Sequence, residues 1–567
     1  MSSTAEGTPL RWLWRYVQRE RAALGAVLAL ALLASALSAL QPWLSKQVID
    51  QGLIAQRFDV LSRLCAALVA LAAGGFALGA LNRWLYVRTS GRILFALRED
   101  VYAHLLALSP EFFRGRPVGD LVTRLDGDVA EVQRFSTDTL LAAVNGCLTL
   151  VAAGALMLAL SPALALIALI VLPLQLLVRY RTRHQVADAA RAVREQTGSV
   201  AHFFVETLGA VKAVQGAAAE DFERARLAAL NQGLLRRLVR QQLLGYVVGA
   251  LAALLSHLAT AAVFIAGGYL VIHGALSVGT LIAFTAYLTR GSGSATSLMG
   301  LYTAWQRAGV SLARVRELLD AQPAHAVPAA RTPVPAAPGP GHVRFERVRC
   351  QRPGLAAPLF SALSLELAPG SKTVLYGDSG SGKSTLVDLL RGFAQPQAGH
   401  VLLDGVDVSA CDPVGLRRSV CVLEAEPVLF RGSVRYNLCY GSFDASEAAV
   451  LGAARRAGVD RIVARLREGY ETQVGSLGAG LSTGQRQRIA IARALLSAPR
   501  VLVLDEATSN LDAAATQAMH ELIDEHFAHC TRLIITHAPE RVPRAGRVLE
   551  LRDGDVYERM PSRVMHG

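Results

Sequence analysis

The sequence predicts a multi-domain protein, with an all-α transmembrane domain of six spans followed by an α/β P-loop domain. Three observations predict this order. The 567 residues are 52% hydrophobic, and the long apolar runs lie in the first half of the chain. A proline-rich segment separates the halves. The second half contains a glycine-rich loop between an apolar strand and a helix. Such a composition excludes an ordinary soluble protein.

Six apolar runs predict the membrane spans. Crossing the ~30 Å hydrocarbon core takes about 20 helical residues, and each run reaches or approaches that length. One such run alone could be a buried helix of a soluble protein, but six in succession argue against that interpretation. The predicted spans cover residues 22–40, 64–81, 140–160, 162–178, 243–272 and 275–305.

Basic residues predict the orientation of these spans. Segments 83–138 and 179–240 contain eight and eleven Arg or Lys residues, whereas the connections at 161 and 273–274 contain none. The positive-inside rule therefore places both long segments and both termini in the cytoplasm. Their apolar spacing is helical, which predicts helices that continue below the membrane. The net charge of +13 indicates a membrane surface rather than nucleic acid, because the basic residues flank apolar runs.

Residues 321–341 (AQPAHAVPAARTPVPAAPGPG) form a Pro/Ala linker. Proline removes a hydrogen-bond donor and fixes φ, so this stretch cannot pack as a regular element. It separates two predicted domains. Residues 1–320 form the transmembrane domain with its cytoplasmic helical extensions, and residues 342–567 form the P-loop domain.

The glycine-rich loop reads GDSGSGKST and matches G-x-x-x-x-G-K-[ST] in full. Such a loop turns tightly enough for its backbone N–H groups to cradle phosphates at a helix N-terminus. Lys383 supplies a charge for the β- and γ-phosphates, and the Ser384 hydroxyl can ligate Mg²⁺. The predicted phosphate ligands are Gly377, Asp378, Ser379, Gly380, Ser381, Gly382, Lys383, Ser384 and Thr385.

Two further apolar strands end in polar side chains. Residues 501–506 read VLVLDE, so two carboxylates follow a buried strand. Asp505 can hold Mg²⁺, and Glu506 can polarise an attacking water as the general base. Residues 533–537 read LIITH, which places His537 where it can contact a γ-phosphate. The second half therefore predicts a nucleotide-hydrolysing site.

Between the loop and the acidic pair lies LSTGQ at 481–485, and the acidic pair continues as LDEATSNLD. This set, in this order, resembles the ATP-binding cassette superfamily. Six spans followed by one nucleotide domain resemble an exporter half-transporter. SPEFFRGRPVGDLVTRL at 109–125 and ETLGAVKAVQGAAAEDFE at 206–223 resemble its two cytoplasmic coupling segments. The resemblance covers nearly the whole chain.

The resemblance implies an ATP hydrolase that uses Mg²⁺ and drives export of an amphiphilic lipid, drug or peptide by alternating access. It implies a dimer in which each ATP lies between the loop of one chain and the signature of a second half-transporter. Ser482, Gly484 and Gln485 would contact the partner's ATP, and Asp512 would reach across. The half-transporter layout also implies a multi-pass protein of a bacterial inner membrane with a cytoplasmic nucleotide domain.

Four positions depart from the family's pattern. The position that usually stacks an aromatic ring on adenine reads Arg352, whose planar guanidinium can also stack on a base. A usual glutamine is Ala425, and a usual signature glycine is Thr483. The segment before the signature, TQVGSLG at 472–478, lacks its usual acidic residues. Ala425 cannot contact Mg²⁺. Thr483 puts a branched side chain where the partner's ATP would approach closely, and the altered segment 472–478 puts coupling to the membrane domain in question.

These departures leave several interpretations open. A homodimer is favoured because it is the commoner arrangement, and a heterodimer would use this chain as its catalytic half. The sequence also permits an importer with an exporter-like fold and an ATP-gated regulatory subunit. The six predicted spans exclude a soluble nucleic-acid ATPase of the same superfamily unless the first half proves soluble. Arg290, inside the sixth predicted span, could meet an anionic substrate or pair locally. Membrane lipid and the unknown substrate are further expected partners, and no nucleic acid is expected.

Overall fold

The computed structural model describes residues 9–321, 339–351, 357–475, 478 and 480–559. The chain divides into two compact units. Met1–Ala103 and Gly119–Leu319 form the first, here called the helical unit. His104–Val118 and Asp320–Gly567 form the second, here called the α/β unit.

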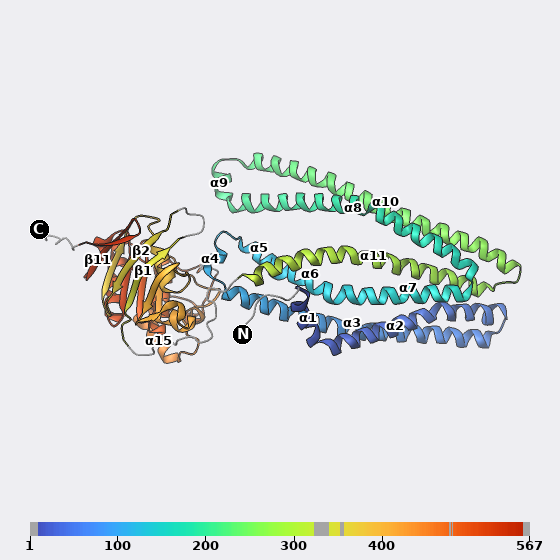
Figure 1. The fold of residues 1–567 in the computed structure, drawn as a ribbon, viewed down its shortest axis with the longest axis horizontal. Helices are drawn as coiled ribbons and strands as arrows, with labels where there is room; N and C mark the ends of the chain where they lie inside the picture. The colour runs from blue at the N-terminus through green and yellow to red at the C-terminus, as the bar shows by residue number, and fades with distance from the viewer. Residues whose placement is uncertain (1–8, 322–338, 352–356, 476–477, 479, 560–567) are drawn as a thin grey trace. The chain divides into compact units, whose positions relative to one another are not determined.

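Long helices make up the helical unit (Figure 1). Its backbone groups are paired within each helix, which is what a hydrocarbon environment requires of a spanning segment. Three short π-helical segments interrupt the regular winding: η1 (Val48–Ile54), η2 (Arg124–Asp128) and η3 (Phe135–Thr139). The α-helices are α1 (Pro9–Arg19), α2 (Arg21–Gln47), α3 (Phe58–Ala107), α5 (Val118–Thr123), α6 (Val129–Arg134), α7 (Leu140–Leu160), α8 (Pro162–Gly209), α9 (Val211–Gly216), α10 (Glu220–Ile272) and α11 (Val278–Asp320).

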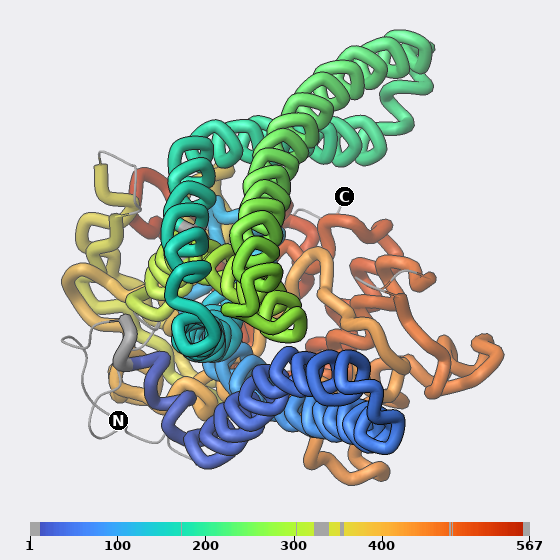
Figure 2. The backbone as a smooth tube through the Cα atoms, turned by 90° about the vertical axis from the view of Figure 1, so that its right-hand side faces the viewer, coloured from blue at the N-terminus to red at the C-terminus, as the bar shows by residue number. Residues whose placement is uncertain are grey.

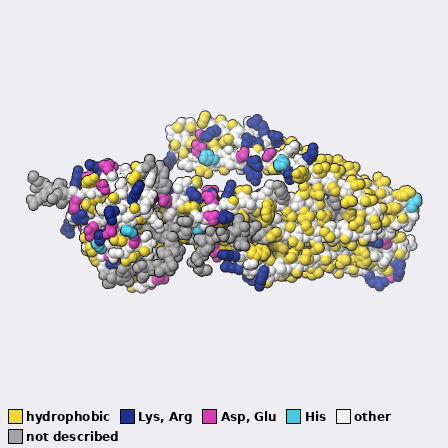
Figure 3. Space-filling model, viewed as in Figure 1, with side chains coloured by type: hydrophobic (Ala, Val, Ile, Leu, Met, Phe, Trp, Pro, Cys, Tyr) yellow, Lys and Arg dark blue, Asp and Glu magenta, His cyan; other side chains and the backbone are white. Residues whose placement is uncertain are grey.

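Among the described residues, five helical segments are long and apolar enough to cross a membrane: Arg21–Ile54, Phe58–Ala107, Val118–Leu160, Pro162–Gly209 and Glu220–Ile272. They contain the first five predicted spans. The sixth predicted span lies in α11, which is long enough but more polar, since it carries Arg290 and the sequence GSGS. Hydrophobic side chains cover the surface of the spanning part of this unit, with Lys and Arg gathered beyond it (Figure 3).

The helices α3, α8 and α10 continue well beyond membrane thickness. They contain 50, 48 and 53 residues, which at 1.5 Å per residue is roughly 70–80 Å each. The predicted continuation of these spans as helices beyond the membrane is therefore confirmed, and the cytoplasmic position of the extensions remains a prediction. Helices α8 and α10 lie side by side along much of their length (Figure 2).

The α/β unit contains a six-stranded sheet in the order β12-β11-β3-β10-β9-β6, parallel except for the β11–β12 pair. A four-stranded antiparallel sheet has the order β2-β1-β4-β5, and β7 pairs with β8. The strands are β1 (Val343–Cys350), β2 (Phe360–Leu367), β3 (Lys372–Tyr376), β4 (Ala398–Leu403), β5 (Val406–Asp407), β6 (Val420–Glu424), β7 (Gly432–Ser433), β8 (Gln473–Val474), β9 (Val501–Asp505), β10 (Thr531–Ile535), β11 (Arg547–Arg552) and β12 (Asp555–Arg559).

The α/β unit also contains short helices, which except for α4 lie between its strands in sequence. They are α4 (Pro110–Phe113), α12 (Lys383–Leu390), α13 (Pro413–Ser419), α14 (Val434–Leu438), α15 (Glu447–Arg456), α16 (Val459–Val463), α17 (Thr483–Ser497) and α18 (Ala513–His526). The 3₁₀ turns are η4 (Val408–Ala410), η5 (Gly469–Glu471) and η7 (Pro539–Arg541).

The central strands are buried on both faces. Along β9, Val501 and Val503 face a core shared with β1, β2, β4 and α12, whereas Leu502 and Leu504 face a core shared with α15 and α17. This alternation follows from the two-residue period of a strand. The parallel pairing of β3, β10, β9 and β6 places their carboxyl ends at one edge, where the predicted site residues lie.

The α/β unit includes a short segment that precedes most of the membrane spans in sequence. Within it, Arg114 donates to Asp388 of α12 over 2.8 Å, and His104 Nε2 lies 3.1 Å from the backbone oxygen of Ala321. The segment that resembles the first coupling segment therefore contacts the helix that follows the phosphate loop. The predicted domain boundaries remain predictions, and most of the predicted linker lies outside the described residues.

Candidate active site

Four parallel strands bring the predicted catalytic residues to one edge of the sheet. The order β3-β10-β9-β6 places the phosphate loop after β3, His537 after β10 and Asp505 at the end of β9. Ile535 pairs in register with both Leu375 and Asp505. Sequence segments more than a hundred residues apart therefore meet where ligands bind in open parallel sheets.

The phosphate loop has the tight geometry that its glycines predict. Gly380 and Gly382 have positive φ angles of 87° and 108°. A Cβ on Gly382 would lie 2.7 Å from the Phe360 ring, and one on Gly377 would lie 2.3 Å from the Leu551 carbonyl oxygen. Glycine is therefore required at both positions by space, and at Gly382 by conformation as well.

The loop buries the Lys383 side chain and the Ser381 hydroxyl, whereas Ser379 and Ser384 are exposed. Lys383 is 7% exposed, and its Nζ donates to the carbonyl oxygens of Gly377 and Asp378 over 2.7 and 2.9 Å. The Ser381 hydroxyl is buried and has no hydrogen-bond partner among the described residues. Helix α12 begins at Lys383, so its free N–H groups open toward the loop. A phosphate would satisfy this arrangement of donors.

Asp505 and Glu506 lie beside the loop at the end of β9. Burial raises the pKa of the Asp505 carboxyl, and the neighbouring carboxylates of Glu506 and Glu424 raise that pKa further, whereas Lys383 lowers it. A carboxylate in this position is short of positive charge, which a cation would supply. The surroundings of Asp505 therefore fit a role in binding Mg²⁺.

Glu506 and His537 form a close pair. Their Oε1 and Nε2 atoms lie 2.7 Å apart, and the side chains are 35% and 53% exposed. Glu506 has a φ of 52°, which is unusual for a residue with a side chain, and its backbone N–H donates to Ile535 across the sheet. The strained turn aims the carboxylate toward His537, so the predicted base and the predicted γ-phosphate contact share one position.

The signature residues begin α17. Ser482 Oγ accepts from the Gln485 N–H over 3.3 Å, and Gln485 Oε1 accepts from the Ser482 N–H over 2.8 Å. This reciprocal pair is a capping box. A Cβ on Gly484 would meet nothing within 4 Å. Asp512 caps α18 by accepting from Ala515 N–H over 2.7 Å. Within one chain Ser482, Gln485 and Asp512 therefore cap helices, and the contact of these residues and of Gly484 with a partner's ATP remains a prediction.

The region around Ala425 contains a residue that sequence reasoning left aside. Glu424 ends β6, pairs in register with Asp505 and acts electrostatically on it. The backbone oxygens of Glu424 and Ala425 accept from Gln487 Nε2 over 2.8 and 2.9 Å. Ala425 itself offers no ligand. The signal in the sequence was the position of Glu424 at a strand end, where it adds a third carboxylate.

Two predicted features are not fully described. Arg352 lies outside the described residues, as do residues 476 and 477 of the segment TQVGSLG. In the described part of the chain, no group of three or more His, Cys, Asp or Glu side chains could hold a metal ion. Mg²⁺ bound together with phosphates needs only one or two protein carboxylates plus waters, so the Ser384 hydroxyl and Asp505 suffice as donors.

Arg290 contacts the neighbouring helix α2. Its guanidinium donates to the backbone oxygen of Ser38, to Ser38 Oγ over 2.9 Å and to Gln41 Oε1 over 2.9 Å. Tyr287, one turn away, donates to the Ala39 carbonyl oxygen over 2.7 Å. These contacts match the local pairing of Arg290 that the sequence left open.

Comparisons with known proteins agree with this architecture. A family model described as the ABC transporter transmembrane region matches residues 24–292. A second, described as ABC transporter, matches residues 360–509. The solved structure of a bacterial Atm1-family ABC exporter with ATP bound superimposes with a TM-score of 0.80 at 26% identity, over 95% of each chain.

Curated relatives belong to the same class. A fatty acid ABC transporter ATP-binding/permease protein of Mycobacterium bovis is 33% identical over 80% of this chain and 71% of that protein. An ATP-dependent lipid A-core flippase of Syntrophus aciditrophicus is 29% identical over 79% and 74%. An ABC multidrug transporter of Aspergillus fumigatus is 32% identical over 79% of this chain and 56% of that protein.

The fold, the phosphate loop and these similarities agree on one assignment. The chain binds ATP, couples its hydrolysis to transport and crosses a membrane several times. One chain carries one membrane domain and one nucleotide domain, so it must associate with a second half. This chain therefore belongs to the ATP-binding cassette transporter family, as an exporter half-transporter.

Proposed function

We propose that this chain works as a homodimer in a bacterial inner membrane and exports an amphiphile. The three relatives named above are described as transporters of fatty acid, of lipid A-core or of several drugs. What these named substrates share is an apolar part that favours the membrane. The apolar surface of the helical unit, which a molecule dissolved in the membrane would contact, supports the proposal.

The hydrolytic roles follow from the edge of the sheet. Lys383 and the loop N–H groups hold the β- and γ-phosphates, Glu506 accepts a proton from the attacking water, and His537 contacts the γ-phosphate. Ser384 and Asp505 hold Mg²⁺, which supplies neutralisation of phosphate charge when bound. The single observation that carries the hydrolytic role is the 2.7 Å pair of Glu506 and His537 beside the phosphate loop.

The homodimer is favoured because Glu506, His537 and the phosphate loop are all intact in this chain. The signature keeps Ser482, Gly484 and Gln485, and Thr483 directs its side chain to its own helix, where Oγ1 accepts from Arg486 over 3.2 Å. A threonine held in this way does not cover Gly484. This contact supports a signature that works in both halves.

The experiment is ATP-driven uptake by the purified chain, reconstituted alone into vesicles with its nucleotide domain outside. Uptake of a labelled amphiphile against its gradient, dependent on ATP and abolished by Glu506→Gln, is expected. Flux only down the gradient would indicate an ATP-gated subunit. ATP-driven movement from inside to outside would indicate an importer.

The dimer is tested separately with the same preparation. A homodimer predicts ATP hydrolysis by the chain alone. Bound ATP without hydrolysis, restored by adding a second half-transporter, would identify a heterodimer. Dilution of wild-type chain with Glu506→Gln chain should lower the activity more steeply than in proportion if the two sites act together.

A further inference from the structure

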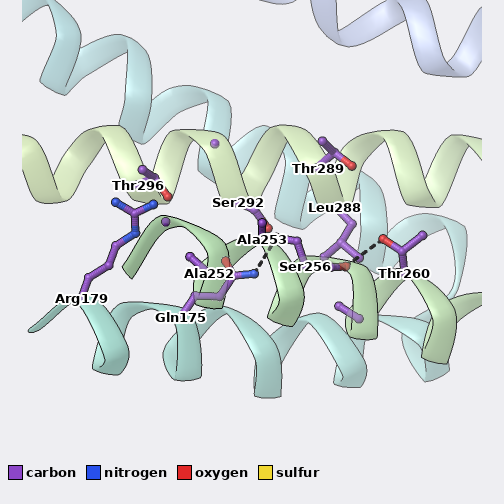
Figure 4. Close-up of a pocket in the computed structure, with 13 residues that line it drawn as sticks. Gln175, Arg179, Ala252, Ala253, Ser256, Thr260, Leu288, Thr289, Ser292 and Thr296 are labelled. Carbon is purple, nitrogen blue, oxygen red and sulfur yellow. Dashed lines mark hydrogen bonds between the residues drawn. The ribbon is translucent and has the colours of Figure 1, made fainter. Parts of the chain in front are cut away.

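A polar cavity lies between three helices of the helical unit. Its volume is ≈300 Å³, and residues of α8, α10 and α11 line it (Figure 4). Gln175 and Arg179 come from α8, Ser256 from α10, and Ser292 and Thr296 from α11. Polar side chains of three spans therefore converge on one space.

The cavity lies at the cytoplasmic side of the spanning region. Arg179 follows the start of α8 at Pro162 by 17 residues, and Thr296 follows the start of α11 at Val278 by 18 residues. At 1.5 Å per residue both lie roughly 26 Å below the outer ends of their helices. Since the hydrocarbon core is about 30 Å thick, Arg179 lies near its inner boundary.

Arg179 is the one charged residue among the described residues that line this cavity. Its Nε is buried without a hydrogen-bond partner in the described part of the chain. Figure 4 shows its guanidinium directed toward Thr296 across the cavity. A guanidinium at this depth is stabilised only if an anion neutralises it or water hydrates it. An anionic group in the cavity would neutralise this guanidinium.

The hydroxyl groups around Arg179 can donate further hydrogen bonds. The Ser256 hydroxyl accepts from Gln175 Nε2 over 2.9 Å, so its own hydrogen is free to be donated. The hydroxyls of Ser292 and Thr296 have no hydrogen-bond partner within the described ranges. One cation and several hydroxyl donors match a small group rich in acceptor oxygens, such as a carboxylate or a phosphate monoester.

The size of the cavity and its neighbour restrict the ligand further. Small-molecule sites usually span about 300–1,000 Å³, so this one holds a head group rather than a large glycolipid. A second cavity of ≈280 Å³ is lined by apolar residues and glycines of α7, α8 and α11, and Leu288 borders both cavities. A wall residue of that second cavity, Leu169, is 68% exposed on the apolar surface. An acyl chain beside the polar cavity therefore has an apolar place to lie.

We propose that the cavity around Arg179 binds the anionic head of a single-chain amphiphile, such as a fatty acid, at the inner side of the membrane. This inference rests on the proposed export of amphiphiles and names the chemical class. Arg179 provides the charge, and Ser256, Ser292 and Thr296 provide hydrogen bonds. The apolar cavity beyond Leu288 takes the chain.

The test is equilibrium binding of radiolabelled palmitate to the purified full-length chain, without nucleotide. Unlabelled hexadecanol, lysophosphatidate and hexadecyltrimethylammonium compete as neutral, phosphate and cationic probes. We expect palmitate to bind more tightly than hexadecanol and the cation not to compete. Competition by lysophosphatidate stronger than by palmitate would identify a phosphate head as the preferred source of the anion. Equal competition by all three probes would overturn the inference.

The decisive variant is Arg179→Gln, with Arg181→Gln as its matched control on the same helix. Arg181 is exposed and does not line the cavity. Palmitate affinity should fall about 10- to 100-fold in Arg179→Gln, the range for losing hydrogen bonds to a charged group, and should not change in Arg181→Gln. Hexadecanol affinity should change in neither. Equal palmitate affinity in both variants would overturn the inference.

Two further variants keep the test decisive if Arg179→Gln does not fold. Arg179→Lys keeps the charge but not the planar fork, so it should retain part of the affinity. Ser292→Ala combined with Thr296→Val should weaken palmitate binding while leaving Arg179 in place. Full palmitate affinity in both would contradict the proposed contacts.

The failure of this inference is distinguishable from that of the proposed function. Palmitate binding that depends on Arg179, without ATP-driven movement of palmitate, would support the binding site and contradict the proposed export of palmitate. If Arg179→Gln exports other amphiphiles normally and the wild-type chain does not bind palmitate, the proposed export would be supported and the binding site contradicted.

Discussion

The helical unit and the α/β unit differ in how their chemistry is distributed along the chain. In the α/β unit the phosphate loop, Asp505, Glu506 and His537 each follow or end a strand, and the parallel sheet brings those strand ends together. In the helical unit the polar groups are single residues on different helices, such as Gln175, Ser256 and Thr296. Catalytic groups can therefore be found from local motifs, whereas substrate contacts depend on which helix faces meet.

The largest expected effect tests the catalytic edge. Replacing Glu506 by Gln keeps the shape but removes the base, so ATPase activity should fall by about 10²–10⁴-fold while ATP binding persists. Glu426→Gln is the matched control, because Glu426 is an exposed carboxylate two residues beyond β6. ATPase assays and nucleotide binding on the two variants measure the difference. Activity retained in Glu506→Gln would move the base to another carboxylate, with Glu424 the first to examine.

The second prediction separates function across the dimer from folding within one chain. Gly484→Ala meets no atom within 4 Å, so the melting temperature should not change. ATPase activity should nevertheless fall by about tenfold or more, because the added methyl group reaches the partner's ATP. Gly382→Ala is the contrast, since the added Cβ would lie 2.7 Å from the Phe360 ring. This variant should lower both the melting temperature and the ATPase activity. Normal ATPase in Gly484→Ala would argue against the predicted signature contact.

The third prediction sharpens the difference between two arginines of the helical unit. Arg290→Ala removes hydrogen bonds to Ser38 and Gln41. It should reduce stability by about 2 kcal/mol, as for hydrogen bonds to a charged group. Palmitate affinity should stay unchanged, in contrast to Arg179→Gln. Thermal unfolding in detergent and the palmitate assay measure both properties. A loss of palmitate affinity in Arg290→Ala would restore Arg290 as a substrate contact.

The fourth prediction concerns pH. Because the pKa of Asp505 is raised in the folded protein, its ionised form destabilises the fold at neutral pH. Without nucleotide or Mg²⁺, Asp505→Asn should therefore raise the melting temperature at neutral pH. The difference should narrow as the pH falls through the raised pKa, since the wild-type carboxyl then takes up a proton. Asp512→Asn is the control and should change little, because Asn is as good a helix cap. A lower melting temperature in Asp505→Asn at neutral pH would contradict this account.

The smallest expected effect tests the contact of Arg114 with Asp388. The two side chains are 53% and 23% exposed, so Arg114→Ala should change stability by less than about 1 kcal/mol. Stimulation of the ATPase by a transported amphiphile should weaken more than basal activity. Exchange of the two charges, Arg114→Asp with Asp388→Arg, should restore stimulation. Unchanged stimulation in Arg114→Ala would show that this contact carries no signal.

Much of the fold follows from local patterns in the sequence. The phosphate loop, the strand VLVLDE and five of the spans are contiguous segments whose composition determines their structure. The composition of the sixth predicted span indicates a membrane helix less strongly, because Arg290 and GSGS lower its hydropathy. The sequence places Arg290 in this span. It does not predict the hydrogen bonds of Arg290 to Ser38 and Gln41, because those bonds depend on how α2 and α11 pack.

Other site features depend on register and on shared space. Glu424 contributes to the acidic edge only because β6 pairs with β9 residue by residue, which no local motif specifies. Arg179 reads in sequence as one of several arginines that follow an apolar run. The cavity that distinguishes it from Arg181 is formed by three helices, and no spacing along one helix reveals it.

The discontinuity of the α/β unit has a consequence for biosynthesis. His104–Val118 belong to this unit, but Gly119–Leu319 are translated and inserted into the membrane before the rest of it emerges. His104–Val118 therefore emerge from the ribosome long before α12, which Arg114 contacts, has been synthesised. Arg114 therefore has no contact with Asp388 until α12 has been translated, so this contact can form only after the spanning helices have been synthesised. A nucleotide domain expressed from residue 342 onward would lack this piece.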